Sequence, residues 1–228
     1  MRFASFLSTT LATAALTALA LPSYAQFSLV TVRANIAEND AIDWGQFGPV
    51  STNVTNPSSG VTDGGVDFTV SKTTSGVFQR RDQNNGWLGN FSPGDELLYT
   101  NLTAGPLTVD FGTNQLLAGG VQIQGNVFSS FNATVEALDA DGTVVFSSAL
   151  IPGTSNNNAD DSAIFIGVES VSQPFARLRF NVAAGADFAI NQASLRFVSE
   201  GATAPEPGAL SLLAIGMVAF GVVVRRRK

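Results

Sequence analysis

Short β-type runs separated by glycine, asparagine, aspartate and proline fill most of the chain, and no segment shows sustained helical periodicity. Residues 175–183 show the pattern clearly, because apolar side chains there alternate with Arg177, Arg179 and Asn181. A strand of this kind has one face in a core and one in water. Roughly eight to eleven such runs predict an all-β fold, an antiparallel two-sheet sandwich of jelly-roll or Greek-key type. A single sheet closed on itself is the alternative.

Two local features follow from the same reasoning. Asp141-Gly142 lies between two β-rich halves and readily adopts the positive φ values of a tight turn, which predicts a hairpin. In residues 187–198 the apolar positions change parity after Ile190. Side chains of a strand alternate with a period of two, so the change requires an extra residue and predicts a bulge near Asn191-Gln192.

The first residues have the three parts of a secretory signal peptide: Arg2, an apolar stretch at 11–21 and the small-residue site Ser23-Tyr24-Ala25. We expect cleavage after Ala25. A transmembrane helix is the alternative, but the apolar run is shorter than the ~20 residues that span a bilayer. The expected organisation is a signal peptide at 1–25, one exported β domain at 26–204 and a terminal segment at 205–228.

Charge and composition exclude several functions. Residues 26–204 carry 17 acidic and 7 basic side chains, a net charge of −10, which repels nucleic-acid phosphates. The chain has no cysteine and no histidine. Disulfides, Ser-His-Asp triads, cysteine nucleophiles and zinc sites built from histidine or cysteine are therefore all excluded.

The last residues combine an apolar run with a basic end. Residues 208–224 carry no charge and would form ~26 Å of helix, close to the ~30 Å thickness of a bilayer core. Arg225, Arg226, Arg227 and Lys228 follow at once and predict a cytoplasmic C-terminus with the β domain outside. A permanent single-pass anchor would need nothing more than these two parts.

Pro205, Glu206 and Pro207 stand directly before that run. The prolines hold the triplet extended, as a protease requires, whereas an anchor has no need of them. Triplet, hydrophobic helix and basic cluster together resemble the PEP-CTERM sorting signal of exopolysaccharide-producing Gram-negative bacteria. The resemblance implies that exosortase recognises the triplet and that the helix is removed. Stretches such as "GNFSPGDELLYT" and "FAINQASLRF" are similar to recurring blocks of PEP-CTERM β domains, which implies a sandwich without naming a ligand.

Catalytic and metal sites have only weak candidates. Glycoside hydrolysis needs two carboxylates that flank the bond to be cleaved, and the acidic pairs in the sequence are Asp95-Glu96 and Asp160-Asp161. Neighbouring side chains of a strand point to opposite faces, so an adjacent pair does not by itself form such a site. We therefore expect no enzyme. Oxygen ligands suitable for calcium occur at Asp139 and Asp141 and in the loop with Asn158, Asp160 and Asp161. Turn formation is the favoured explanation of Asp139 and Asp141.

Trp44, Trp87 and Tyr99 are scarce large aromatics that could stack on a sugar ring, with partial burial as the favoured alternative. The 17 phenylalanines are mostly assigned to the core. An exposed aromatic platform would favour a carbohydrate-binding module. Buried aromatics would favour a structural matrix protein, and carboxylates that converge in a cleft would favour a polysaccharide-acting enzyme.

The sequence thus predicts an exported, non-enzymatic protein that signal peptidase and exosortase process during transit through the inner membrane. We expect it at the cell surface or in the extracellular matrix, associated with exopolysaccharide. No cofactor is expected, and calcium is the one candidate ion. A carbohydrate-binding module on the cell surface is the alternative, followed by a polysaccharide-acting enzyme.

Overall fold

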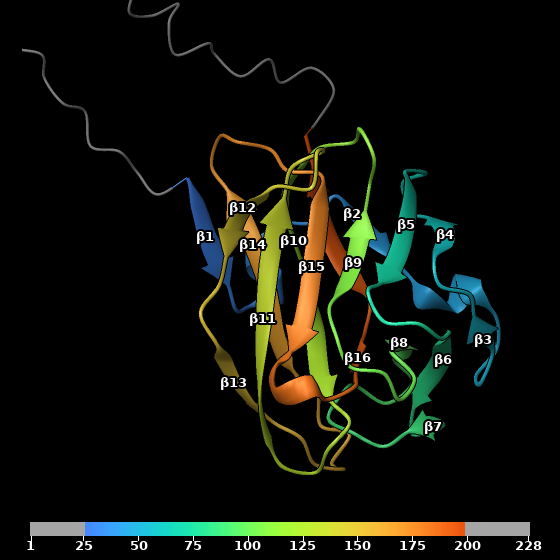
Figure 1. Ribbon diagram of the computed structural model, residues 1–228. Coiled ribbons are helices and arrows are strands. Elements are labelled where there is room, and N and C mark those ends of the chain that lie inside the picture. The colour runs from blue at the N-terminus through green and yellow to red at the C-terminus, as the bar shows by residue number, and fades with distance from the viewer. Residues whose placement is uncertain (1–25, 199–228) are drawn as a thin grey trace, which may run out of the picture.

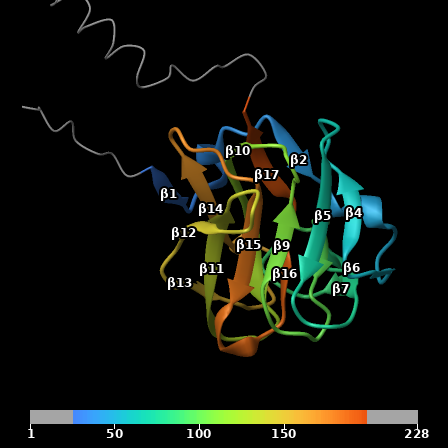
Figure 2. The ribbon, with the colours of Figure 1, turned by 45° about the horizontal axis from the view of Figure 1, so that its top comes forward.

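The computed structural model describes residues 26–198 of the chain, which form two β-sheets and three short 3₁₀ helices. Figures 1 and 2 show the sheets as two layers, with β11, β15 and β9 lying in front of β10 and β16 in the view of Figure 1. No helix within residues 26–198 has the length and apolar character needed to cross a membrane. The expected signal peptide at 1–25, the terminal segment 205–228 and its helix at 208–224 lie outside the described residues.

The larger sheet has ten strands in the hydrogen-bonded order β1, β14, β10, β16, β8, β6 and β3. β17 also pairs with β10 and continues to β2, and β7 pairs with β6. Every pair is antiparallel except β6 with β7. The strands are β1 (Phe27–Val30), β2 (Asp40–Ile42), β3 (Asn53–Val54), β6 (Phe78–Gln83), β7 (Gly86–Trp87), β8 (Glu96–Tyr99), β10 (Leu116–Gly125), β14 (Ile164–Ser170), β16 (Phe188–Ile190) and β17 (Ala193–Phe197).

The smaller sheet has seven antiparallel strands in the order β12, β11, β15, β9, β5 and β4, with β13 paired to β11. Its strands are β4 (Ser58–Val61), β5 (Asp67–Lys72), β9 (Leu107–Asp110), β11 (Ser130–Leu138), β12 (Val144–Ser147), β13 (Ile151–Thr154) and β15 (Arg177–Val182). The 3₁₀ helices are η1 (Arg33–Ile36), η2 (Trp44–Phe47) and η3 (Ala183–Gly185).

One hydrophobic core lies between the two sheets and draws on both. Val121 and Ile123 of β10 belong to the same buried cluster as Leu178 and Phe180 of β15. In β15 every second side chain is buried, as the alternation with arginine and asparagine predicted. The prediction of an all-β fold with two sheets is confirmed for residues 26–198, where the sheets are antiparallel except for the pair of β6 with β7, and the jelly-roll or Greek-key assignment stays a prediction.

The predicted hairpin joins β11 and β12, which pair antiparallel around Asp141-Gly142. Gly142 has a φ of 85°, in the left-handed region that glycine adopts without steric cost. The carboxylate of Asp139 accepts hydrogen bonds from the backbone N–H groups of Asp141 (3.0 Å) and Thr143 (2.8 Å). The hairpin prediction is therefore confirmed, and the side chain of Asp139 holds the turn.

The predicted bulge is also present. Between its pairs with β16 and β17, β10 has two residues, 121 and 122, where the opposite chain has three, 191–193. The amide oxygen of Asn191 accepts a hydrogen bond from the backbone N–H of Gln122 at 3.0 Å. A side chain thus replaces the backbone partner that the extra residue removes from the ladder.

The two ends of the described range lie at the same end of the molecule. The carbonyl of Gln26 accepts a hydrogen bond from Val171, and Val198 donates one to Gln115, directly before β10 begins. At ~3.3 Å per residue, the ten residues of β10 place its other end, followed by loop 126–129, ~30 Å away. In Figure 1 the blue start of β1 and the red end of the described chain accordingly lie toward the top, opposite the loops at the bottom.

Candidate functional site

The residues expected to carry sorting and processing are not among those that the structure describes. Ala25 precedes the described range, and Pro205, Glu206, Pro207, Arg225, Arg226 and Arg227 follow it. Within residues 26–198 the structure bears on the aromatic, acidic and polar candidates.

The three aromatics proposed for sugar stacking are all buried. The indole N–H of Trp44 donates to the carbonyl of Asn191 at 2.8 Å inside the main core. The rings of Trp87 and Tyr99 pack against each other with centroids 5.2 Å apart. None of the three rings offers a free face to a sugar, because neighbouring side chains already cover them.

An exposed aromatic occurs instead at Phe128, whose accessible fraction is 69%. It lies in loop 126–129, beside the half-exposed Val127 and near Leu88 across a small hollow of about 40 Å³. Assigning the phenylalanines mostly to the core missed this residue. The available signal was its setting in "GNVFSS", where Phe128 is flanked by glycine, asparagine and serine and belongs to no alternating run.

The calcium candidates take part in hydrogen bonds with the protein. Asp139 holds the turn described above, and Asp160 accepts from the backbone and hydroxyl of Ser162 and from Asn90. Asp161 accepts instead from the side-chain amide of Gln122 at 2.8 Å. Within the part of the chain that the structure describes, no three acidic side chains gather closely enough to hold a metal ion.

The acidic pair Asp95-Glu96 divides between two faces of the larger sheet. Asp95 accepts a hydrogen bond from the amide of Asn191 at 2.9 Å, whereas Glu96 pairs with Arg80. This follows from the alternation of side chains at the start of β8. The neighbouring carboxylates therefore do not form a joint site.

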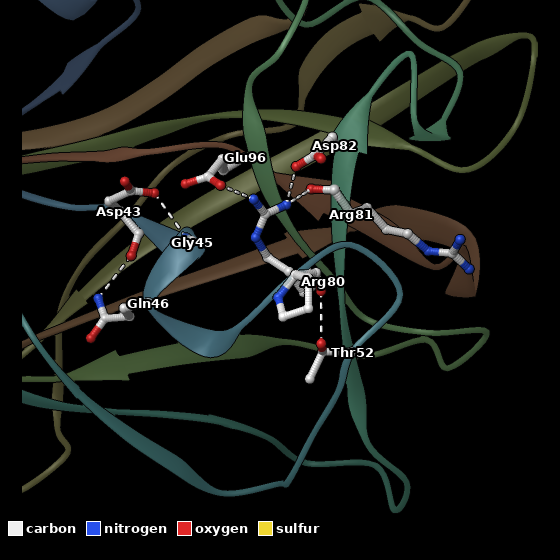
Figure 3. A network of polar contacts seen from close by, with 9 residues as sticks. Asp43, Gly45, Gln46, Thr52, Arg80, Arg81, Asp82 and Glu96 are labelled. Atoms are coloured by element: carbon white, nitrogen blue, oxygen red, sulfur yellow. Dashed lines mark hydrogen bonds and ion pairs between the residues drawn. The ribbon is translucent and has the colours of Figure 1, made fainter.

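Glu96 belongs to a charged group at one edge of the core, which we call the Arg80 network and which comprises Asp43, Arg80, Asp82 and Glu96 (Figure 3). Arg80 shares the inward face of β6 with Phe78 and is only 1% exposed. One end of its guanidinium contacts Asp82 and the carbonyl of Arg81, and the other end contacts Glu96. A charge removed from water in this way requires such partners.

Asp43 closes the network from the start of η2. Its carboxylate caps η2 by accepting a hydrogen bond from the N–H of Gly45 at 2.8 Å. The Glu96 carboxyl lies so close to Gly45 that a methyl group there would be 1.9 Å from Oε2. A hydrogen bond between the two carboxyls raises the pKa of Glu96 and lowers that of Asp43.

This geometry balances charge and does not suit glycosidic cleavage. Two carboxyls that share a hydrogen bond leave no room for a sugar linkage, which needs ~5 Å or more between them. Sequence reasoning missed the network, although "FQRRDQ" places Arg80 at the inward parity set by Phe78. An arginine at an inward-facing position of a strand indicates either a buried ion pair or an edge of the core.

Two larger surface depressions have contrasting linings. The first, about 480 Å³ in volume, lies where β11 and β13 meet the start of β14, and we call it the β13 groove. Among residues 26–198 no charged side chain lines it; its lining is Ser130, Phe131, Asn132, Pro152, Gly153, Thr154, Asn156, Ser162 and Ile164. The second, about 510 Å³, is the β5 hollow, whose lining includes Asp67 and Asp110.

Comparison with known proteins identifies the C-terminal segment. Residues 203–228 match the PEP-CTERM protein-sorting motif, so the chain carries this motif. The motif supports an exported protein that exosortase sorts to the cell surface of a Gram-negative bacterium. No curated protein sequence matches the chain.

Solved structures show only distant similarity. The structure described as CpGH89CBM32-6 produced by Clostridium perfringens is 15% identical, with 57% of this chain and 94% of that chain covered and a TM-score of 0.31. The infectious bursal disease virus Gx strain structure is 15% identical over 77% of this chain and 56% of that chain, with a TM-score of 0.14. TM-scores this low carry no argument about function.

Proposed function

We propose that this chain is an exported, non-enzymatic protein that exosortase processes at its PEP-CTERM motif and that acts in the exopolysaccharide matrix or at the cell surface. The match at residues 203–228 carries the proposal. The signal-peptide pattern before Gln26 supports export from the other end of the chain. Exosortase and signal peptidase are the processing partners, and the inner membrane is the place of transit.

The position of the two ends supports removal of both terminal segments. Gln26 and Val198 lie at one end of the described structure, where each makes a backbone hydrogen bond to a neighbouring segment. Cleavage after Ala25 and at Pro205-Glu206-Pro207 would break bonds outside both sheets. The two-sheet core would therefore keep all of its strands after processing.

A structural role without catalysis is supported by the side chains of the described region. The chain has no histidine or cysteine, and the neighbouring carboxyls of Asp43 and Glu96 balance the charge of Arg80. The calcium candidates make hydrogen bonds within the protein.

A carbohydrate-binding module is the second candidate. Burial of Trp44, Trp87 and Tyr99 removes the platform first considered, but Phe128 and the uncharged β13 groove offer a different surface. Binding residues are found most often on loops, and Phe128 lies on one.

Intact-mass measurement and terminal sequencing of the protein recovered from the producing cell's surface and medium test the proposal. We expect a chain that begins at Gln26 and ends within Pro205–Pro207. In a variant with all three residues of the triplet changed to alanine, we expect the full C-terminus and retention in the membrane. Glu200→Ala, an acidic change just before the motif, is the matched control and should be processed normally. A wild-type chain that still ends at Lys228 would overturn the proposal.

A further inference from the structure

We infer that the β13 groove binds an uncharged polysaccharide chain, with Phe128 stacking on a sugar ring next to the groove. The inference rests on the proposed function, because it assigns a ligand class to a protein of the extracellular matrix. It is carried by the lining of the groove, by the charge of the remaining surface and by the position of the groove.

The groove combines apolar side chains with polar ones, three of which make no hydrogen bond to the described residues. The ring of Phe131 lies under Gly153, where a methyl group would be 2.4 Å from the ring. Close approach of the β13 backbone to this ring thus requires glycine. The side chains of Ser130, Asn132 and Thr154 make no hydrogen bond to any group within residues 26–198. Ser130, Asn132 and Thr154 lie on the exposed face of β11 and β13, which also carries Pro152, and this mixture of polar and apolar groups matches the polar edges and apolar faces of a sugar chain.

Charge selects among polymers. Residues 26–204 carry a net charge of −10, so a polyanion would be repelled by most of the surface. The lining of the β13 groove carries no charged residue, whereas the β5 hollow of similar volume includes Asp67 and Asp110. A cation would be drawn to the β5 hollow, and an uncharged chain loses nothing in the β13 groove.

Phe128 stands close to the groove in the chain. Loop 126–129 leads directly into Ser130 of the groove, and the carbonyl of Ser129 accepts a hydrogen bond from the backbone N–H of Ser155, between the groove residues Thr154 and Asn156. The ring is 69% exposed, although an aromatic side chain gains most when its apolar surface is covered. A sugar ring would cover it without any rearrangement of the sheets.

The location suits a ligand in the matrix. The groove lies beside the last residues of β10, where Ile164 pairs with Ile123, and Phe128 follows that end, so both are far along β10 from the end where Gln26 and Val198 are found. Whatever holds the chain termini, at the membrane or at a surface polymer, leaves this opposite end accessible.

Affinity gel electrophoresis tests the inference. The full chain, purified in a polyoxyethylene detergent that carries no sugar headgroup, is run in native gels containing extracellular polysaccharide from the producing cell. That polysaccharide is first separated by anion exchange into an uncharged and an anionic fraction. We expect retardation by the uncharged fraction alone, and an apparent affinity at least fivefold lower for Phe128→Ala and for Asn132→Ala.

Two control variants are matched to these changes. Leu102→Ala removes an apolar side chain that is 79% exposed and lies outside the groove lining, and Thr113→Ala removes a hydroxyl from the β5 hollow. Both should run as the wild type does. Absence of retardation by the uncharged fraction, equal retardation by the anionic fraction, or wild-type mobility of both groove variants would overturn the inference. Correct terminal processing of a non-binding protein would leave the proposed function intact and contradict the groove alone.

Discussion

The Arg80 network and the β13 groove show two ways in which polar side chains sit next to the same core. In the network, a guanidinium only 1% exposed contacts two carboxylates, and a third carboxylate closes the group. In the groove, the exposed side chains of Ser130, Asn132 and Thr154 have no hydrogen-bond partner among the described residues. The difference indicates that the network serves stability and that the groove is free to serve binding.

The sharpest way to break this comparison is to remove the central charge of the network. Arg80→Met should lower the free energy of unfolding by about 3 kcal/mol, the low end for a broken buried pair, because the carboxylates of Asp82 and Glu96 are partly exposed. Denaturant unfolding of the protein recovered from the cell surface measures the change. Arg81→Met is the control: its guanidinium lies 5.8 Å from the Tyr99 ring, and its loss should cost less than about 1 kcal/mol. Equal effects of the two variants would contradict a stabilising role for the network.

A smaller loss of stability is expected from a change at Gly45, where the carboxyl of Glu96 contacts the backbone of η2. Gly45→Ala would push the flexible carboxyl of Glu96 away from both Arg80 and Asp43, at a cost of about 1.5 to 3 kcal/mol for hydrogen bonds to charged groups. In a Glu96→Ala background the same change should cost almost nothing, because no carboxyl remains to be displaced. Additive costs in the double variant would show that the methyl group acts elsewhere.

The opposite pKa shifts of Asp43 and Glu96 predict a modest pH dependence of stability. Because the pKa of Glu96 is raised, its contribution to folding stability is complete below pH 4.5, the usual pKa of a glutamate. That contribution is lost as the pH rises through the raised pKa. The lowered pKa of Asp43 acts in the opposite direction, since its contribution is lost as the pH falls through the lowered value. Glu96 is 39% exposed, so solvent screening keeps the loss above pH 4.5 below about 1 kcal/mol.

Melting temperatures measured between about pH 4 and pH 8 test this dependence through Glu96→Gln. The amide of glutamine donates to Asp43 at every pH, so the variant should lose less stability than the wild type as the pH rises. An unchanged slope would contradict the raised pKa of Glu96.

Alternation and turn chemistry predicted much of the fold because both depend on neighbours in the sequence. The arginines between the apolar residues of β15 fix its two faces, Asp141-Gly142 fixes a turn, and the parity change after Ile190 fixes a bulge. Each of these features needs only a few residues to be recognised. The sorting motif was likewise readable because its parts are contiguous.

The candidate sites were less predictable because they depend on contacts between distant segments. Trp87 stands in a polar, glycine-bearing stretch, yet Tyr99 and Phe91 cover its ring once β6, β7 and β8 come together. Asp43 and Arg80 meet only through the packing of η2 against β6 and β8. The β13 groove is lined by β11 and β13 of one sheet and by β14 of the other, so no single segment of the sequence predicts it.

The smallest expected effect gives the closest test of the comparison, because it exchanges the same two side-chain types in opposite directions. Asn132→Asp places a carboxylate in the β13 groove, where solvent keeps it hydrated, and should change the free energy of unfolding by no more than about 0.5 kcal/mol. The reverse exchange, Asp82→Asn, removes a charged partner of the buried Arg80 and should cost at least about 1.5 kcal/mol. Unfolding of both variants under one condition compares them directly. If Asn132→Asp were the more costly, the groove would be part of the packed structure, and its polar groups would not be available to a ligand.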